Sequence, residues 1–155
     1  MIRGFNHVGI SVADLDRSIR FYREAFGLEV IERCAFSGEL YQKILALSGA
    51  RGRVALLRNG NLQLELFEFA APQGVRRPEE RSVAELGISH FCVDTSDIES
   101  EYVRLQGCGA SFHCPPLDFD GRAKATYGRD PDGNVFELWE RGPRSDEYQP
   151  GHPGV

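Results

Sequence analysis

The sequence lacks the features that mark proteins of nucleic acids and membranes. Its 18 basic residues are outnumbered by 23 acidic ones, giving a net charge of −5, and they form no basic stripe. No apolar run approaches the roughly 20 residues that a membrane-spanning helix needs. The N-terminal MIRGFNHVGI has neither a long apolar stretch nor a cleavage site. We therefore expect a cytoplasmic protein that binds neither nucleic acid nor membranes.

Cysteine is scarce, and its spacing carries no motif. The four cysteines include no CxxC pair: Cys34, Cys92, Cys108 and Cys114. We expect them to be reduced, partly buried thiols. The remaining composition, 41% hydrophobic and 26% charged, is ordinary for a globular protein that buries a core, and 155 residues fit one domain or two small similar halves.

The first half of the chain alternates strand and helix patterns. Residues 5–12 (FNHVGISV) alternate with period 2, which predicts a strand with His7 on one face and Val8 and Ile10 on the other. Asp14 then begins a helix that Gly27 ends. The pattern continues with a strand near 28–36, a short helix over 39–47, and strands over 53–58 and 61–69 that the hairpin signal Asn59-Gly60 joins.

The pattern then restarts after a break. Residues 70–86 are polar and rich in helix and strand breakers, so we expect a linker. Beyond it, ISHFCVD predicts a strand, SDIESEYVRLQGCG a helix, and ASFHC, RAKATYG and NVFELWER three further strands. Residues 142–155 are rich in proline and glycine, and we expect a mobile tail.

The two halves repeat one design. Asp14 follows His7 by seven residues, and Asp97 follows His90 by seven. Each half ends in a strand that carries a glutamate shortly after a Gly-Asn turn: Glu65 in the first half and Glu137 in the second. The sequence therefore predicts an α+β fold of two βαβββ modules, over residues 1–69 and 87–141, with the short helix inserted in the first.

Strand alternation separates these polar residues from the core. In each module the apolar face must cover the helix, and the opposite face carries one histidine and one glutamate. If the two sheets face each other, the four side chains converge: His7, Glu65, His90 and Glu137. Two imidazoles and two carboxylates would be unfavourable together unless a cation lay between them. Their nitrogen and oxygen atoms suit Zn, Ni, Co, Mn or Fe(II).

Four segments carry a family resemblance: NHVGISVADLDRSIRFYREAFGLEV, LELFEF, SHFCVD and GRDPDGNVFELWE. They resemble the vicinal oxygen chelate superfamily, which includes glyoxalase I, bleomycin-resistance proteins and extradiol dioxygenases. The likeness covers residues 5–141. It implies paired βαβββ modules that form an open, barrel-like sheet around one metal ion. It also implies a homodimer.

The resemblance implies that the metal ligands are His7, Glu65, His90 and Glu137. That order is similar to bacterial glyoxalase I, which favours Ni, Zn, Co or Mn over Fe. The same resemblance gives Glu137, or Glu65, the role of moving a proton next to a metal-bound carbonyl of a small organic substrate. The positions that hold glutathione in the bacterial enzyme are Ser11 and Phe69 here, so the substrate stays open.

Aromatic residues of the same strand parity complete the expected site. Phe67, Phe69, Val135 and Trp139 would line an apolar pocket. Tyr127, ten residues before Glu137, resembles the active-site tyrosine of extradiol dioxygenases. Two alternatives to a lyase or isomerase therefore stay open: a non-catalytic binder of the bleomycin-resistance type, and an Fe(II) ring-cleaving dioxygenase.

The remaining polar residues get no role in chemistry from their positions. Glu68 and Glu140 fall on the opposite strand parity from the site, facing solvent or the helix. We expect His113 at the surface or the rim of the pocket, and Lys124 on a solvated edge.

Overall fold

The computed structural model describes residues 1–75 and 81–145. The chain divides into two compact units, Met1–Glu80 and Arg81–Val155. Part of the expected linker, residues 76–80, and most of the expected mobile tail, residues 146–155, lie outside the described residues. In the part of the chain that is described, no helix is long and apolar enough to cross a membrane.

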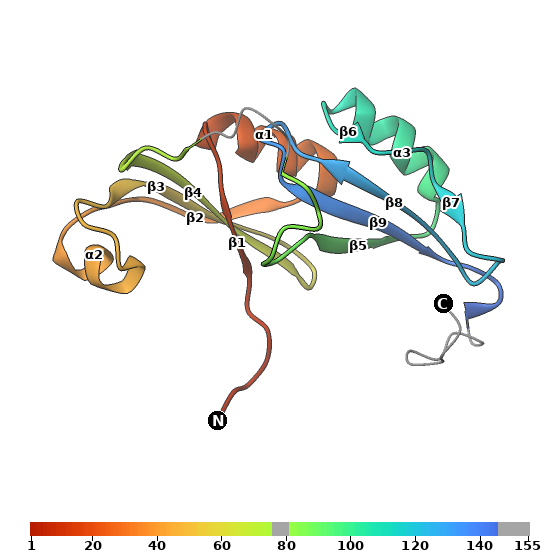
Figure 1. Ribbon diagram of the computed structural model, residues 1–155, viewed down its shortest axis with the longest axis horizontal. Helices are drawn as coiled ribbons and strands as arrows, with labels where there is room; N and C mark the ends of the chain where they lie inside the picture. The colour runs from red at the N-terminus through yellow and green to blue at the C-terminus, as the bar shows by residue number, and fades with distance from the viewer. Residues whose placement is uncertain (76–80, 146–155) are drawn as a thin grey trace. The chain divides into compact units, whose positions relative to one another are not determined.

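Unit 1 is a four-stranded sheet with one long helix. Its elements are β1 (Val8–Ser11), α1 (Leu15–Phe26), β2 (Glu29–Phe36), α2 (Glu39–Leu45), β3 (Arg51–Asn59) and β4 (Leu62–Ala71) (Figure 1). The strand order is β1-β4-β3-β2, with β1 parallel to β4 and the other pairs antiparallel. This is the predicted βαβββ order, and α2 is the predicted insertion.

The boundaries of α1 follow from its two end residues. The side chain of Asp14 accepts a hydrogen bond from the Arg17 N–H at 3.0 Å, which satisfies one of the free donors of the first turn. Gly27 ends the helix with a φ of 63°, a conformation that glycine adopts without a steric cost. Between them, Leu15 and Tyr22 are fully buried against β3 and β4, so the apolar stripe forms the core of the unit.

Unit 2 repeats this arrangement with a broken edge strand. Its elements are β5 (Phe91–Thr95), α3 (Ile98–Gly107), β6 (Ser111–Phe112), β7 (Leu117–Asp118), β8 (Ala123–Arg129) and β9 (Val135–Arg141). The order is β5-β9-β8-β6, and β7 also pairs with β8. The sequence predicted one strand over 110–114. The structure has two short ones, because Pro115 and Pro116 lack the N–H that a continuous ladder needs.

The duplication extends to the contacts between each sheet and its helix. Leu15 N–H donates to Glu68 Oε2 at 2.7 Å, and Ile98 N–H donates to Glu140 Oε2 at 2.6 Å. Both glutamates therefore face a helix, one of the two positions expected for them. They also satisfy the first N–H of that helix, a role that strand parity did not reveal.

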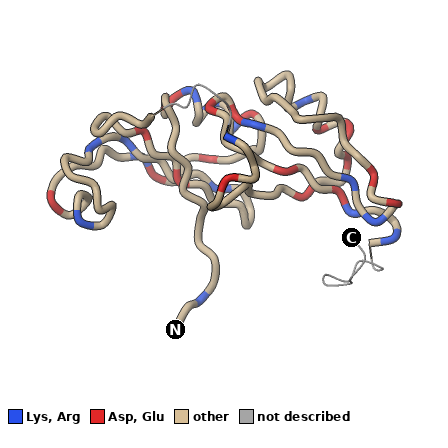
Figure 2. Tube along the Cα trace, in the orientation of Figure 1, with Lys and Arg blue, Asp and Glu red and all other residues tan. Residues whose placement is uncertain are grey.

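A basic residue stands directly across the sheet from each of these glutamates. Arg53 is opposite Glu68 and contacts Asp16 of α1 at 2.9 Å. Lys124 is opposite Glu140 and contacts Glu99 of α3 at 2.6 Å. Lys124 thus binds the helix of its own unit rather than forming the simple solvated edge that we expected. Figure 2 shows how acidic and basic residues are interspersed along the described chain.

The α+β class is confirmed, with two sheets and few helices. Each sheet ends in edge strands and does not close into a barrel: β1 and β2 are the edges of the first sheet, and β5 and β6 are edges of the second. The faces predicted from alternation are also confirmed, since Leu64, Leu66 and Phe136 are fully buried on the helix side.

Candidate metal centre

In unit 1 a histidine and a glutamate meet on the sheet face opposite α1. Gly9 of β1 is the register partner of Glu65 in β4, and His7 precedes Gly9 by two residues, on the same side of the strand. His7 Nε2 lies 3.3 Å from Glu65 Oε2. The exposed fractions of the two side chains are 37% and 29%, so a ligand in solution can reach them.

Unit 2 places the second pair in the same way. Cys92 of β5 is the register partner of Glu137 in β9, and His90 precedes Cys92 by two residues. His90 Nε2 lies 3.1 Å from Glu137 Oε2, and the exposed fractions are 26% and 14%. Each unit therefore brings together the two residues that the sequence assigned to it. The contact between them comes from one repeated strand register.

Hydrogen bonds orient His7 within its pair. His7 Nδ1 lies 2.8 Å from Asn6 Oδ1, and Gln63 Nε2 donates to the same oxygen at 3.0 Å. Because Asn6 Oδ1 is an acceptor, the ring proton of His7 lies on Nδ1, and Nε2 of the neutral ring presents a lone pair to Glu65. A lone pair and a carboxylate oxygen at 3.3 Å repel each other unless a proton or a cation lies between them.

His90 is held by a different neighbour. Ser89 Oγ lies 2.9 Å from His90 Nδ1, and a hydroxyl can donate or accept, so this contact fixes the ring orientation without fixing the tautomer. In both units the second ring nitrogen is thus engaged, while Nε2 points to the glutamate. This arrangement is compatible with metal binding at Nε2, since a neighbour orients the other ring nitrogen of each histidine.

The spacing within each pair suits two ligands of one ion. Metal–nitrogen and metal–oxygen bonds of about 2.0–2.2 Å at right-angled to tetrahedral geometry separate neighbouring donor atoms by about 2.9–3.4 Å. The observed separations of 3.3 Å and 3.1 Å lie in this range. Among residues 1–75 and 81–145, no group of three or more His, Cys, Asp or Glu side chains is arranged to hold a metal. Each pair alone supplies two candidate ligands.

The comparison with known families decides the ancestry of this repeat. Residues 4–138 match the model of the glyoxalase/bleomycin resistance protein/dioxygenase superfamily, a stretch that contains all four residues of the two pairs. The chain belongs to this superfamily. The match confirms the resemblance in the sequence.

Several curated members of the superfamily are similar over most of the chain. A putative lactoylglutathione lyase of Brassica oleracea var. gemmifera is 32% identical over 144 residues, covering 91% of this chain and 45% of that protein. A lactoylglutathione lyase of Arabidopsis thaliana is 30% identical over 149 residues, covering 94% of this chain and 47% of that protein. The chain thus spans about half the length of these relatives.

Solved structures of the superfamily share the fold. A glyoxalase family protein from Bacillus cereus has a TM-score of 0.82 at 24% identity, covering 91% of this chain and 95% of that one. The fosfomycin resistance protein FosX of Listeria monocytogenes, solved as a mutant complex with Mn(II), has a TM-score of 0.66 at 18% identity, covering 96% and 100%. At these identities the likeness concerns the fold alone.

In this superfamily member, two protonated groups flank Glu137. Tyr127 is its register partner on β8, and the Tyr127 ring lies 4.9 Å from the His90 ring. Burial, and then the charge of Glu137, raise the pKa of Tyr127. Although Cys92 keeps contact with solvent, desolvation of its thiol and the charge of Glu137 raise its pKa to about 12. Both groups therefore stay protonated near neutral pH.

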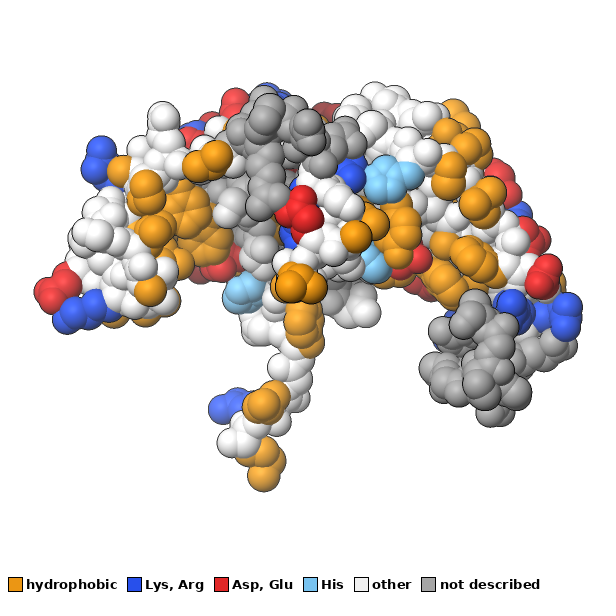
Figure 3. Space-filling view, viewed as in Figure 1, with side chains coloured by type: hydrophobic (Ala, Val, Ile, Leu, Met, Phe, Trp, Pro, Cys, Tyr) orange, Lys and Arg blue, Asp and Glu red, His pale blue; other side chains and the backbone are white. Residues whose placement is uncertain are grey.

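The other expected aromatic residues pack against rings of their own unit. Phe67 and Phe69 stack at 5.7 Å and both meet the buried Phe36, in a cluster that α2 covers with Tyr41 and Leu45. Figure 3 shows hydrophobic side chains gathered beside α2. Phe67 and Phe69 share the strand parity of Glu65, as predicted, and they pack mainly on one another. In unit 2, Trp139 stacks on Phe119 at 6.4 Å.

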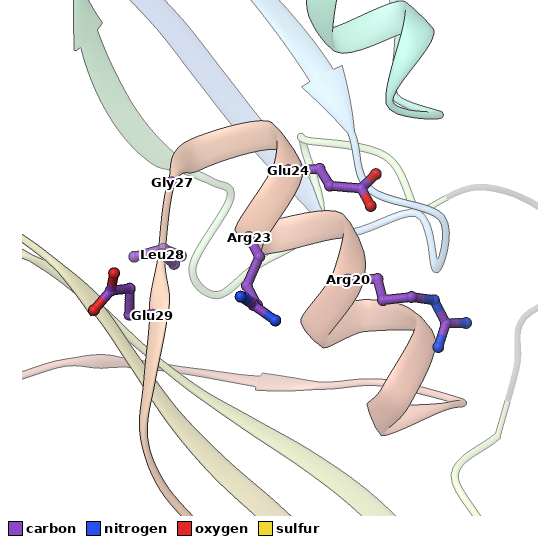
Figure 4. A pocket seen from close by; sticks show the side chains of 6 residues that line it. All are labelled: Arg20, Arg23, Glu24, Gly27, Leu28 and Glu29. Carbon is purple, nitrogen blue, oxygen red and sulfur yellow. The ribbon is translucent and has the colours of Figure 1, made fainter.

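A depression of about 420 Å³ lies elsewhere, at the C-terminal end of α1 (Figure 4). It is lined by two arginines, two glutamates, one glycine and one leucine: Arg20, Arg23, Glu24, Gly27, Leu28 and Glu29. Its opposite charges balance, and none of the residues expected in the site lines it.

Proposed function

We propose that the chain is a metal-dependent lyase or isomerase of the glyoxalase type, with His7, Glu65, His90 and Glu137 as its metal ligands. The observation that carries this proposal is the duplicated contact between Nε2 and Oε2, at 3.3 Å and 3.1 Å, built by the same strand register in both units. We propose Ni, Zn, Co or Mn as the metal. Imidazole nitrogen and carboxylate oxygen suit these ions as well as Fe(II), and the resemblance to bacterial glyoxalase I favours these four over iron.

The proposal gives each unit half of the ligand set. An ion with four ligands needs one His7–Glu65 pair and one His90–Glu137 pair, which one chain or two copies of it can supply. We propose that the protein works as a homodimer. Asn6 and Ser89 then act as orienting neighbours of His7 and His90.

A divalent ion held by these residues would act as a Lewis acid, withdrawing electrons from a substrate carbonyl so that the adjacent C–H becomes acidic. Glu137, loosened from the ion when substrate arrives, would remove that proton and return it to the neighbouring carbon. Two observations support this role for Glu137. Its side chain is only 14% exposed, which limits exchange with water. Its neighbours Tyr127 and Cys92 are held protonated.

The proposed substrate is a small, carbon-rich carbonyl compound with two neighbouring oxygens. The names of the relatives suggest an α-ketoaldehyde adduct of a thiol. Phe69 packs among aromatic rings, and Ser11 ends β1, so neither position carries the charge or amide that a glutathione clamp would use. We therefore propose a thiol less polar than glutathione.

One observation favours a second candidate, the ring-cleaving dioxygenase. Tyr127 lies beside both His90 and Glu137, where a phenol could bind the oxygen of a substrate. Such an enzyme needs iron and three ligands, and it does not need Glu65. The Glu65→Gln variant, assayed without added metal, therefore separates the two candidates: the lyase loses activity because it loses its metal, whereas ring cleavage survives.

Proton exchange tests the proposal directly. Metal-loaded protein is mixed in D₂O with adducts of methylglyoxal or phenylglyoxal and a panel of thiols, and product formation and deuterium uptake at carbon are followed by NMR. The proposal predicts turnover with at least one adduct and its loss in Glu137→Gln. Glu29→Gln, an exposed change on β2, is the control that should keep the activity. If wild-type and Glu137→Gln proteins turn over an adduct equally well, Glu137 is not the base.

A further inference from the structure

A row of side chains crosses the sheet of unit 2 beside the proposed base. His113 N–H donates to Tyr127 O at 2.9 Å, which continues the β6–β8 ladder and places His113 opposite Tyr127. Tyr127 is in turn opposite Glu137. Residues directly opposite each other share a face, so His113, Tyr127 and Glu137 lie on one face, with His113 about 10 Å from Glu137 across two strand spacings.

The rings in this row are in contact. The His113 and Tyr127 rings lie 6.1 Å apart, and the Tyr127 and His90 rings lie 4.9 Å apart. His113 is exposed. It therefore lies on the face of the sheet that carries Glu137. An exposed position agrees with the surface or rim position expected from the sequence.

A buried arginine fixes the state of this imidazole. Arg129 is only 5% exposed, and its guanidinium donates from Nε to His113 Nε2 at 3.0 Å, from Nη1 to Gly133 O at 2.9 Å and from Nη2 to Arg81 O at 2.9 Å. The two carbonyl contacts hold the guanidinium in place independently of His113.

The direction of the Arg129–His113 bond is not ambiguous. A guanidinium has no acceptor atom, so Arg129 must donate and His113 Nε2 must accept. The proton of the neutral ring is then on Nδ1. His113 is thus held as a hydrogen-bond donor through Nδ1, and its Nε2 is occupied.

We propose that His113 is a specificity-determining residue, which donates from Nδ1–H to an uncharged oxygen of the substrate that lies beyond the two oxygens at the reacting end. Arg129 is its positioning residue. This inference rests on the proposed function, since it assumes that the reacting end binds at His90 and Glu137. It narrows the class of substrate to compounds with a third oxygen acceptor, such as a keto or amide carbonyl. That oxygen would lie beyond the Tyr127 ring, as seen from the reacting end.

The tautomer of His113 is the first test and needs no substrate. Two-bond ¹H–¹⁵N spectra at pH 8, with the His113 signals assigned by their loss in His113→Gln, should show the proton on Nδ1. In Arg129→Lys, which keeps the charge and loses the Nε–H donor, the Nδ1–H tautomer should no longer dominate. A wild-type spectrum with the proton on Nε2 would overturn the inference.

A pair of probes tests the donor role. Acetohydroxamate offers two neighbouring oxygens, and succinamohydroxamate adds a carboxamide oxygen two methylenes away. In zinc-loaded wild-type protein, calorimetry should show that the amide probe binds about fivefold to tenfold more tightly, the gain of one net hydrogen bond. That ratio should fall to about one in His113→Leu and be partly restored in His113→Gln, which keeps a neutral donor.

The two proposals fail in different ways. Equal affinity of wild-type protein for the two hydroxamates would overturn the role of His113 and leave the metal site standing. If neither hydroxamate binds the zinc-treated wild-type protein, the proposed function itself is contradicted, and the role of His113 falls with it.

Discussion

Glu65 and Glu137 hold equivalent positions in their sheets. Each stands directly opposite the residue two places after a histidine, Gly9 in one unit and Cys92 in the other, and each meets that histidine through Oε2. Two unrelated surface contacts would not be expected to have the same strand register, the same pair of contacting atoms and nearly the same distance. This equivalence supports the proposal that both pairs have the same role, as metal ligands.

The two glutamates are expected to differ in chemistry. Replacing a general base costs about 10²–10⁴-fold in rate, so Glu137→Gln should lower kcat by at least about a hundredfold. Glu65→Gln should chiefly weaken metal binding, because an amide oxygen is a poorer ligand than a carboxylate. Steady-state kinetics at saturating metal distinguish the two. A larger loss of kcat in Glu65→Gln than in Glu137→Gln would reverse the assignment of the base.

The helix contacts of Glu68 and Glu140 should contribute to stability. Each carboxylate accepts a hydrogen bond from the first N–H of a helix and lies at its positive end. Glu68→Gln and Glu140→Gln should each lower the free energy of unfolding by about 1 kcal/mol. Urea denaturation measures the change, with exposed Glu29→Gln as the control. A loss no greater than that of the control would mean that water replaces these carboxylates without cost.

The aromatic cluster under α2 should stabilise unit 1 through Phe36. This side chain is 2% exposed and packs on Phe67, Phe69 and Tyr41. Truncation to alanine leaves a cavity, so Phe36→Ala should cost about 3–5 kcal/mol, whereas Phe36→Leu should cost less because it fills more of the space. Both are measured by denaturant unfolding. Equal losses in the two variants would contradict this, because they would show that the volume filled at position 36 does not set the stability of the cluster.

Cys92 should be an unreactive thiol in metal-free protein. Its pKa is raised to about 12, first by desolvation and then by Glu137, so the thiolate is scarce at pH 8 and increases only as the pH rises toward that value. The unfolded chain ionises near the ordinary thiol pKa of about 8.5. This contribution to stability is therefore complete below that pH and is lost as the pH rises to about 12.

Alkylation with iodoacetamide, followed by peptide mass spectrometry, measures the reactivity of Cys92. At pH 8 the native protein should be modified at Cys92 at least tenfold more slowly than the urea-unfolded protein. The exposed Cys34 of β2 serves as the internal reference. A Cys92 that reacts as fast when folded as when unfolded would contradict the raised pKa.

Much of the fold could be predicted from the periodicity of the sequence. The repeat of His7, Asp14 and Glu65 in His90, Asp97 and Glu137 gave both modules and the faces of their strands, because alternation and capping are local properties of the chain. The structure adds the register that brings each histidine to its glutamate. The units contain that contact, whereas the role of the four residues as ligands of one metal stays a prediction.

Local sequence patterns did not predict hydrogen bonds between polar groups that are far apart in the chain. Glu68 and Glu140 share their strand parity with the core, and nothing local shows that each reaches a helix N-terminus. One signal was available: both lie three residues after the glutamate of a pair. The Arg129–His113 bond joins residues 16 apart, on strands whose register only the structure supplies.

The central claim is that His7, Glu65, His90 and Glu137 bind one divalent metal ion. Elemental analysis by mass spectrometry on untagged protein as purified measures it most directly, scored as metal per chain in wild-type, His7→Ala and His90→Ala proteins. The account predicts close to one equivalent of Ni, Zn, Co or Mn in wild-type protein and its loss in both variants, one from each unit. Wild-type protein that carries no metal and takes up none from an excess would contradict it.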